Sequence, residues 1–311
     1  MVIAGLTPRE AVRAVEARLS AAGCPDADYD ARELFRVAAG RDARLSDRVL
    51  TTEEAEKLEA LCTRREQREP LQYLCGIWSF LDFDLAVGPG VLCPRADTEV
   101  VAEAAANTLT GIAAPRVLDL CAAPGGKSLH AADKMRNQGC VEARDLTEYE
   151  VDLIRENVQR AGVSCVVPKV KDAEQLDAEW IGKADVVIAD LPCTGYGVIG
   201  RKPDIKYYAS KEKEEELVRI QRAILANAAS YVKPGGTLLY STCTVNRKEN
   251  SENAAWFLEQ FPFEAVSLDE LLPDELKSGE TAKGQLQLIP GVHKTDGFFL
   301  AKFRKTEKGR A

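Results

Sequence analysis

The sequence lacks the features of membrane-spanning and secreted proteins. No apolar run in its 311 residues approaches the ~20 residues needed to cross a bilayer. The first residues, Met1 to Gly5, lack the basic region and the apolar stretch of a secretory signal. We therefore expect a cytoplasmic protein that does not associate with a membrane.

The sequence also lacks the usual patterns of disulfide-bonded and zinc-binding domains. It has nine cysteines but no CxxC pair, and its only histidines are His130 and His293. Scattered cysteines in a chain of this length are not the framework of a small secreted domain. Neither histidine lies near paired cysteines, so no metal site is expected. Most of the thiols are expected to be small, buried side chains.

The sequence has no excess of basic residues, with 41 Lys and Arg against 49 Asp and Glu and a net charge of −8. Phosphate contacts need clustered cations, so this balance counts against nucleic-acid binding over the whole surface. An acidic protein can still carry a local basic stripe. The candidate cations are Arg201, Lys202, Lys206, Arg247 and Lys248. The basic tail from residue 302 onward is interpreted as solvated surface charge.

The first third of the chain predicts helices followed by a hairpin. A length of 311 residues, 45% of them apolar and 29% charged, fits a globular protein of two domains. Thr7-Pro8-Arg9-Glu10 has the pattern of a capping box before a helix that ends at Gly23. Alternating apolar residues between 77 and 87 predict a hairpin with Asp82 near its turn. Further helices are expected over 28–39, 51–68 and 98–109.

From Arg116 onward, predicted strands and helices alternate. Strands are expected over 117–120, 140–144, 165–170, 184–189, 237–241 and 298–303, and helices over 127–135, 148–161, 211–232 and 249–260. This alternation predicts an α/β fold with a parallel sheet covered on both faces. Ligands of such sheets bind at the carboxyl ends of the strands.

A glycine-rich turn follows the first of these strands. Its sequence is Cys121-Ala122-Ala123-Pro124-Gly125-Gly126-Lys127. Glycines let the backbone approach a ligand closely, and the amino terminus of the next helix offers free N–H groups. The turn matches neither GxGxxG nor the Walker sequence, so an ordinary structural turn is the alternative interpretation.

Aspartates lie at the ends of the next three strands, at Asp145, Asp172 and Asp190. Asp145 is placed to hold ribose hydroxyls, and Asp172 is placed to meet an adenine edge. Each aspartate alone could be a helix cap or a solvated charge. Together with the turn, they predict a nucleotide-type cofactor. No arginine lies near the turn to neutralise a pyrophosphate, which favours S-adenosylmethionine over a dinucleotide.

Two cysteines, Cys193 and Cys243, follow predicted strands at the same edge of the sheet. A cysteine in such a protein is ordinarily a buried structural thiol. A thiolate is needed where the target atom is a poor nucleophile, such as carbon 5 of cytosine. Attack at carbon 6 gives an enamine that takes a methyl group at carbon 5, which requires a nucleophile, an acid at ring nitrogen 3 and a releasing group. Asp190, Cys193 and Cys243 could supply all three.

At these residues, the chain from about 116 to 303 resembles the Nop/Sun family of RNA 5-methylcytosine methyltransferases, in particular its bacterial small-subunit rRNA enzymes. The motifs that carry the resemblance are CAAPGGK at 121–127, ARD at 143–145, KDA at 171–173, DLPC at 190–193, GVIGRKPDIK at 197–206, KPGG at 233–236, STC at 241–243, Glu249-Asn250 and DGFF at 296–299. The family usually has Ala in place of Leu191 and often Trp in place of Tyr207. Neither departure removes a reacting atom.

The resemblance implies a Rossmann-like class I methyltransferase sheet, S-adenosylmethionine as cofactor and an RNA substrate, with rRNA as the expected RNA. It implies that Cys243 is the nucleophile and that Cys193 helps to release the product. Asp190 would touch both cofactor and cytosine, with Lys127 nearby. The expected cofactor-binding residues are Cys121, Ala122, Ala123, Pro124, Gly125, Gly126, Lys127, Asp145, Asp172 and Asp190. The residues expected to hold the RNA backbone are Arg201, Lys202 and Lys206.

Residues from about 9 to 117 instead resemble the release-factor glutamine methyltransferase family. The specific stretches are REPLQY at 68–73, GPGVL at 88–92 and CPRADTE at 93–99. In that family this region is a helical, release-factor-docking domain with a hairpin linker. The catalytic Asn-Pro-Pro-Tyr of that family is absent, and DLPC at 190–193 takes its place. The helical RNA-binding domain and the ferredoxin-like subdomain expected before the Nop/Sun catalytic region are also missing.

We therefore expect a helical domain over 1–75, a hairpin and helix linker over 76–112 and a methyltransferase domain over 113–306. The function favoured is S-adenosylmethionine-dependent methylation of cytosine in RNA. Two alternatives stay open. One is a glutamine methyltransferase acting on release factors, against which the missing motif argues. The other is a binding module without catalytic activity.

Overall fold

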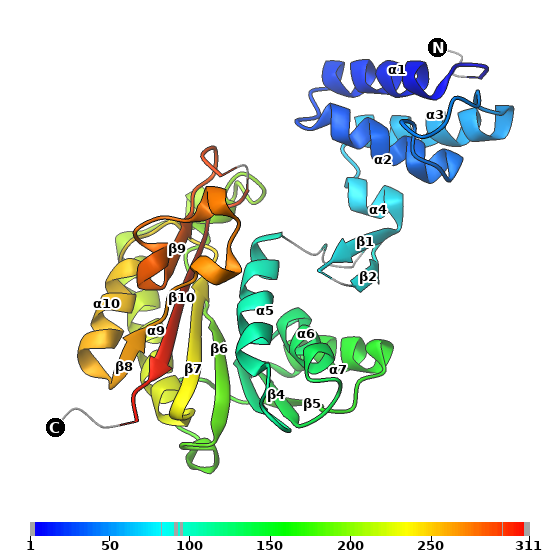
Figure 1. The fold of residues 1–311 in the computed structure, drawn as a ribbon. Helices are drawn as coiled ribbons and strands as arrows, with labels where there is room; N and C mark the ends of the chain where they lie inside the picture. Colours follow the sequence, from blue (N-terminus) through cyan, green and yellow to red (C-terminus); the bar gives the residue numbers. More distant parts are fainter. Residues whose placement is uncertain (1–3, 82, 90–92, 94–95, 294, 308–311) are drawn as a thin grey trace. The chain divides into compact units, whose positions relative to one another are not determined.

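The structure, a computed structural model, describes residues 4–81, 83–89, 93, 96–293 and 295–307. The chain divides into two compact units, residues 1–95 and residues 96–311 (Figure 1). Among the described residues, no helix is long and apolar enough to span a bilayer. The predicted division into three parts, with boundaries after residues 75 and 112, remains a prediction.

The amino-terminal unit contains the helices predicted for it. Its helices are α1 (Pro8–Ala21), α2 (Ala27–Ala39), α3 (Thr52–Glu66) and α4 (Leu71–Cys75). Apolar side chains at helical spacing, such as Val15, Leu34 and Leu58, are fully buried where α1, α2 and α3 meet. The predicted capping box at Thr7 is present, with reciprocal hydrogen bonds between Thr7 and Glu10. Burial of these apolar faces stabilises helices that would be marginal alone.

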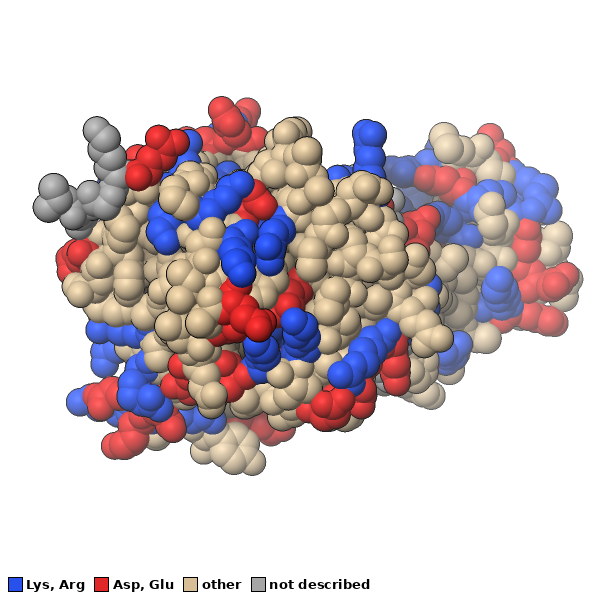
Figure 2. Space-filling view, turned by 90° about the horizontal axis from the view of Figure 1, so that it is seen from below, with Lys and Arg blue, Asp and Glu red and all other residues tan. Residues whose placement is uncertain are grey.

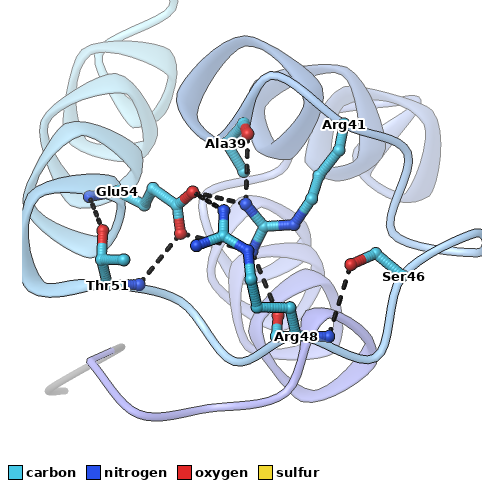
Figure 3. A network of polar contacts seen from close by, with 6 residues as sticks. All are labelled: Ala39, Arg41, Ser46, Arg48, Thr51 and Glu54. Carbon is cyan, nitrogen blue, oxygen red and sulfur yellow. Dashed lines mark hydrogen bonds and ion pairs between the residues drawn. The ribbon is translucent and has the colours of Figure 1, made fainter.

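A second capping box joins the start of α3 to the loop before it (Figure 3). Glu54 bonds the Thr51 backbone and also pairs with Arg41 and Arg48. The Arg41 guanidinium also donates to the carbonyl oxygens of Ala39 and Arg48, at 3.1 Å each. Chiefly through the Arg41 hydrogen bond, the pKa of Glu54 falls to about 2. One carboxylate thus holds the 41–51 loop against α3.

The predicted hairpin is confirmed as β1 (Ile77–Phe80) and β2 (Phe83–Ala86). The strands are antiparallel, with Ile77 opposite Ala86 and Phe80 opposite Phe83. Asp82, expected near the turn, lies outside the described residues.

The carboxyl-terminal unit is built on an eight-stranded sheet. Its strands are β3 (Arg116–Leu120), β4 (Cys140–Asp145), β5 (Val166–Val170), β6 (Ala184–Asp190), β7 (Val232–Thr242), β8 (Phe263–Ala265), β9 (Gln285–Leu288) and β10 (Phe298–Lys305). The order is β5-β4-β3-β6-β7-β10-β8, with β9 also paired to β10. Neighbours from β5 to β7 are parallel.

The expectation of a wholly parallel sheet is wrong at one edge. β10 runs antiparallel to β7, and β8 and β9 pair antiparallel with β10. β8 follows β7 after α10 and runs in the same direction as β7, and β10 then returns between these two strands in the opposite direction. The predicted 298–303 strand was correctly located, but its direction was not encoded in its apolar pattern. β8 and β9 are three and four residues long, too short for a periodic signal.

Helices cover both faces of the sheet, as predicted (Figure 1). The helices of this unit are α5 (Ala96–Leu109), α6 (Gly126–Lys134), α7 (Glu148–Ala161), α8 (Ile205–Tyr208), α9 (Lys211–Tyr231) and α10 (Ser251–Gln260), with 3₁₀ turns at Ala178–Trp180, Tyr196–Val198, Asp269–Leu271, Asp274–Leu276 and Thr281–Lys283; α8 is exposed and is not part of either core. Adjacent strand residues alternate between the two cores: Val117 packs on the side of α5, α6 and α7, whereas Leu118 packs on the side of α9 and α10. Both are fully buried, which explains why these strands read as continuous apolar runs.

The chain reverses its strand order at β3, which lies between β4 and β6. Such a switch point opens a crevice at the carboxyl ends of the strands. β4 and β6 each extend one residue further than predicted, so Asp145 and Asp190 are the last residues of these strands. Two boundaries were wrong. α10 begins at Ser251, so Glu249 lies in the preceding loop instead of the helix, and β7 begins at Val232 instead of residue 237.

Candidate active site

The glycine-rich turn follows β3 in a tightly constrained backbone. Cys121 and Gly125 have φ values of +58° and +105°, and the Ala123–Pro124 peptide is cis. A Cβ on Gly125 would lie 3.2 Å from the Ile154 side chain of α7, so a larger residue there would be crowded, and the positive φ favours glycine. The Ala122 amide donates to the Arg144 carbonyl at 2.7 Å. The turn is therefore pinned beside the end of β4.

Asp145 closes this turn from β4. Its Oδ2 accepts a hydrogen bond from the Ala123 amide at 2.8 Å, and its Oδ1 accepts one from the Leu146 amide at 2.8 Å. Partial burial raises the pKa of this carboxyl group. Asp145 thus links the turn to the next strand. A carboxylate oxygen can accept more than one hydrogen bond, so Asp145 can also accept from a ligand hydroxyl, as the ribose prediction requires.

Asp172 lies beyond β5 in a local cap. Its carboxylate accepts hydrogen bonds from the Glu174 amide at 2.9 Å and from Gln175 Nε2 at 3.1 Å. These contacts are those expected if Asp172 caps the following turn, which was the alternative interpretation of this residue. Its role at an adenine edge stays a prediction.

Lys127 and Asp190 form the charged centre of the crevice. Lys127 Nζ lies 2.8 Å from Asp190 Oδ2, and Ser241 donates to Asp190 Oδ1 at 2.8 Å. Burial alone would lower the pKa of Lys127, but the carboxylates of Asp190 and Asp119 outweigh it and raise that pKa. Lys127 therefore keeps its charge while nearly enclosed. The orientation of Asp190 is fixed from β7 and from α6 together.

Asp119 is a second, fully buried carboxyl group behind this pair. Ser128 donates to its Oδ2 at 2.6 Å. Burial raises its pKa to about 6, although the nearby Lys127 charge opposes the shift. The folded protein thus holds this proton more tightly than the unfolded chain does.

We expect Asp119 to make stability depend on pH. Its proton stabilises the folded state fully below the ordinary pKa of 3.8, and that contribution is lost as pH rises through about 6. Relative to Asp119→Asn, which can still accept from Ser128, the wild-type unfolding free energy should fall by about 2 kcal/mol between pH 4 and pH 7. Urea unfolding of both proteins across this range measures the difference. A pH-independent difference would contradict the shifted pKa.

The two predicted thiols are brought together. Cys193 Sγ and Cys243 Sγ lie 3.4 Å apart. The reason is strand register: Asp190 pairs with Ser241 at the ends of β6 and β7, so each cysteine follows its strand at the same level. The hydrogen bond with Cys243, together with burial, raises the pKa of Cys193 well above its ordinary value. Both effects favour the protonated form of Cys193.

A buried carboxylate ties the two cysteine loops together. Glu249 is fully buried; its Oε1 accepts from the Thr194 hydroxyl at 2.6 Å and its Oε2 accepts from the Thr194 amide at 2.9 Å. Gln221 of α9 donates to Glu249 Oε2 at 3.0 Å and to the Pro192 carbonyl at 2.9 Å. The Thr194 and Thr244 hydroxyls are 2.7 Å apart. Residues on both sides of the thiol pair are therefore held by one network.

Sequence reasoning did not find this role for Glu249. It appeared only as one motif of the family resemblance, with no function attached. A single polar residue at a helix start resembles any other cap, and its partners lie 55 and 28 residues away along the chain. Only the tertiary structure brings those donors to it.

Glu249→Gln should loosen the cysteine loops. The amide nitrogen of glutamine would face a donor at one of the two oxygen positions, so at least one buried hydrogen bond is lost. We expect a loss of about 2 kcal/mol in unfolding free energy and a fall of about tenfold or more in turnover through misplaced thiols. Cofactor affinity should be unchanged, because Glu249 contacts none of the turn. Glu252→Gln, an exposed neighbour, is the matched control. Equal turnover in both variants would count against a positioning role.

The predicted RNA-contacting cations lie together beyond the thiol loop. Arg201 Nε pairs with Asp296 at 2.8 Å, and the Lys206 ammonium lies 5.0 Å from the Tyr207 ring centroid. Lys202 lines a cavity of about 400 Å³ that Thr194 also borders. On the face drawn in Figure 2, by contrast, basic and acidic side chains are interspersed. On that face, contact with a polyanion would depend on local clusters of cations.

The donor set fits S-adenosylmethionine. The turn is followed directly by the amino terminus of α6, Asp145 offers carboxylate oxygens, and Asp190 and Lys127 supply paired charges at the next strand. No arginine of the turn or of these strand ends is placed to neutralise a pyrophosphate. Among the residues that the structure describes, no group of three or more His, Cys, Asp or Glu is arranged to hold a metal ion.

Two family models match the chain in separate regions. Residues 106–304 match the model described as 16S rRNA methyltransferase RsmB/F, which covers more than half of the chain. Residues 10–76 match the model of the PrmC N-terminal domain. Both resemblances drawn from the motifs are thereby confirmed, although the second match ends well before residue 117.

Curated relatives are similar over the carboxyl-terminal region only. The chain is 42% identical over 192 residues to the probable ribosomal RNA small subunit methyltransferase B of Bacillus subtilis, covering 61% of this chain and 43% of that protein. It is 36% identical over 199 residues to ribosomal RNA small subunit methyltransferase F of Escherichia coli, covering 63% and 41%. The chain thus spans about two-fifths of the length of these relatives.

A solved structure shows the same fold. The structure of NSun6 from Pyrococcus horikoshii with SFG aligns with a TM-score of 0.58 and 28% identity, over 69% of this chain and 53% of that chain. The predicted Rossmann-like class I methyltransferase sheet is therefore confirmed, together with the helical region that precedes it. From the motifs, the thiol geometry and the match over residues 106–304, the chain belongs to the family described as 16S rRNA methyltransferase RsmB/F.

Proposed function

We propose that the protein methylates carbon 5 of a cytosine in RNA, most naturally 16S rRNA, with S-adenosylmethionine as methyl donor. The observation that carries this proposal is the pair of thiols 3.4 Å apart at the carboxyl edge of a methyltransferase sheet. One thiol suffices for nucleophilic attack. A second thiol at that distance suits a reaction in which the first must also leave. Ribosomal RNA as the substrate would place the enzyme in the cytoplasm.

The cofactor supplies an electrophilic methyl group when bound, and the residues from Cys121 to Lys127 with Asp145 would hold it. Asp172 is the proposed contact of its adenine. The cytosine would lie between this site and the two thiols. Asp190, held by Lys127 and Ser241, is placed to bind both cofactor and cytosine and to support protonation at ring nitrogen 3.

The cysteines then divide the work between attack and release. The Cys243 thiolate adds to carbon 6 as nitrogen 3 gains a proton, and the electron pair developed at carbon 5 takes the methyl group. A water molecule takes the carbon 5 proton, the electron pair of that C–H bond re-forms the ring double bond as the carbon–sulfur bond breaks, and nitrogen 3 gives back the proton it gained. The Cys193 thiol, which keeps its proton, stabilises the departing sulfur anion with an S–H···S hydrogen bond.

Labelled methyl transfer tests the proposed function. The full chain is incubated with labelled S-adenosylmethionine and with small-subunit rRNA from a strain that lacks 5-methylcytosine in it. Nucleoside analysis should place the label in 5-methylcytosine. Label in another nucleoside, or none in RNA, would sink the assignment.

We propose release-factor docking as a second function, carried by the amino-terminal unit. The supporting observation is the match of residues 10–76 to the PrmC N-terminal domain. Adding a release factor to the labelling assay, with a parallel pull-down by the full chain, tests docking and glutamine methylation together. We expect binding without methylation, because the chain has Asp190-Leu191-Pro192-Cys193 where an Asn-Pro-Pro-Tyr would align a glutamine amide. No retention of the release factor would exclude the docking role.

A further inference from the structure

A cavity of about 400 Å³ opens beside the thiol loop and has no part in the cofactor site. Its lining includes Thr194, Arg201, Lys202, Asp204, Tyr208 and Lys213. None of the turn residues 121–127 contributes to it. We refer to it below as the α8 cavity, because α8 forms part of its wall. Its volume is within the range of pockets that hold small organic ligands.

The lining of the α8 cavity includes a residue that is adjacent in sequence to one of the two cysteines. Thr194, in its lining, directly follows Cys193, and its hydroxyl and amide are both bonded to buried Glu249. A polymer whose target unit reaches the thiol pair would therefore place an adjacent unit at this cavity.

The charge of the α8 cavity suits a phosphodiester. Arg201, Lys202 and Lys213 line it against the single carboxylate of Asp204. Among the described residues, the Lys202 and Lys213 ammonium groups form no ion pair, whereas Arg201 is paired with Asp296. Two cations without ion-pair partners at one wall suit a phosphate, even on a chain whose net charge is −8.

The wall of the cavity also presents an aromatic ring. Tyr208, on α8, keeps 70% of its surface exposed while lining the cavity. Its neighbour Tyr207 is 74% exposed but is not part of the lining. Exposed aromatic rings beside cations are the usual platform for unpaired bases, because every base has a face that can stack.

We propose that the α8 cavity binds the nucleotide adjacent to the target cytosine in single-stranded RNA, with its phosphate on Lys202 and Lys213 and its base stacked on Tyr208. This inference rests on the proposed function for the identity of the polymer. The α8 cavity would thus be a substrate-binding site that selects single-stranded over base-paired RNA, because only an unpaired base can leave its neighbours to stack on a protein ring.

Equilibrium binding to two probes tests the inference without any methyl transfer. The first probe is an oligocytidine of nine nucleotides, in which every register is equivalent. The second is a phosphate–sugar chain of the same length that has no bases. Fluorescence anisotropy is measured for the full-length wild type, Tyr208→Ala, Tyr208→Phe and Tyr207→Ala. Thermal unfolding checks that the variants are folded.

Tyr208→Ala should bind oligocytidine about tenfold more weakly, the effect of losing one base–aromatic stack. It should bind the chain without bases as wild type does, and Tyr208→Phe and Tyr207→Ala should bind both probes normally. Lys213→Ala should weaken binding of both probes and lower the salt dependence by about one counterion, while Lys211→Ala, on the same helix but outside the cavity, should not.

The inference is overturned if Tyr208→Ala binds oligocytidine like wild type, if Tyr207→Ala loses as much affinity, or if the loss is equal with and without bases. Protein-segment binding to the cavity would produce the first of these results. Failure of the proposed function can be distinguished from failure of this inference. In that case the labelling assay would give no 5-methylcytosine, whatever the binding results of the Tyr208 variants.

Discussion

Cys243→Ala is expected to reduce methyl transfer to RNA by about 10³-fold or more, the usual cost of removing a covalent nucleophile. Cytosine carbon 5 is too weak a nucleophile to attack a methyl group unless a thiolate has first added at carbon 6. The structure favours Cys243 for that thiolate, since the pKa of its neighbour Cys193 is raised by their mutual hydrogen bond and by burial. Single-turnover labelling of 16S rRNA measures the loss.

A control separates lost chemistry from lost cofactor binding. Calorimetry should show that Cys243→Ala binds S-adenosylmethionine like wild type, because the cofactor turn is held by Asp145 and Arg144 and not by this thiol. Cys140→Ala, a partly exposed cysteine at the opposite end of β4, should keep full activity. Retention of near-normal transfer by Cys243→Ala would assign the nucleophile elsewhere.

The position of the thiol pair could be predicted from sequence because parallel strands share an edge. The strands predicted to end at 189 and 241 needed only to be neighbours for Cys193 and Cys243 to meet, and β6 and β7 are neighbours. Local periodicity identifies such segments, and alternation with helices makes them parallel. The proximity of Lys127 to Asp190 was expected from the family resemblance and not from the strand pattern, and the two side chains lie 2.8 Å apart.

The network around the thiols could not be predicted in this way. Glu249 was placed at a helix start, and the donors that hold it come from β6's loop and from α9. Arg201 was expected to be free for RNA, but Asp296, nearly a hundred residues further along the chain, pairs with it. Both contacts depend on loops that meet only in the folded sheet. β10 shows the same limit, because its apolar pattern does not distinguish an antiparallel neighbour from a parallel one.

Cys193→Ala should stop the reaction after methyl transfer and trap the protein on its RNA. Without the S–H group 3.4 Å away, the departing Cys243 anion has lost its hydrogen-bond donor, so carbon–sulfur cleavage becomes the slow step. We expect multiple turnover to fall by about 10²- to 10³-fold, with one methyl group still transferred per protein. The adduct should appear as a slowly migrating, labelled band after denaturing electrophoresis.

The double variant Cys193→Ala/Cys243→Ala decides whether the adduct passes through Cys243. If it does, the band disappears in the double variant and persists in Cys193→Ala alone. Full turnover by Cys193→Ala without an adduct would instead mean that the second thiol only packs against the first. The distinction has a physical basis: a thiol needed for attack would lower the rate of adduct formation, whereas a thiol needed for release lowers only its decay. Loss of the adduct without Cys243 and its accumulation without Cys193 would therefore show that the contact between the two sulfur atoms serves product release.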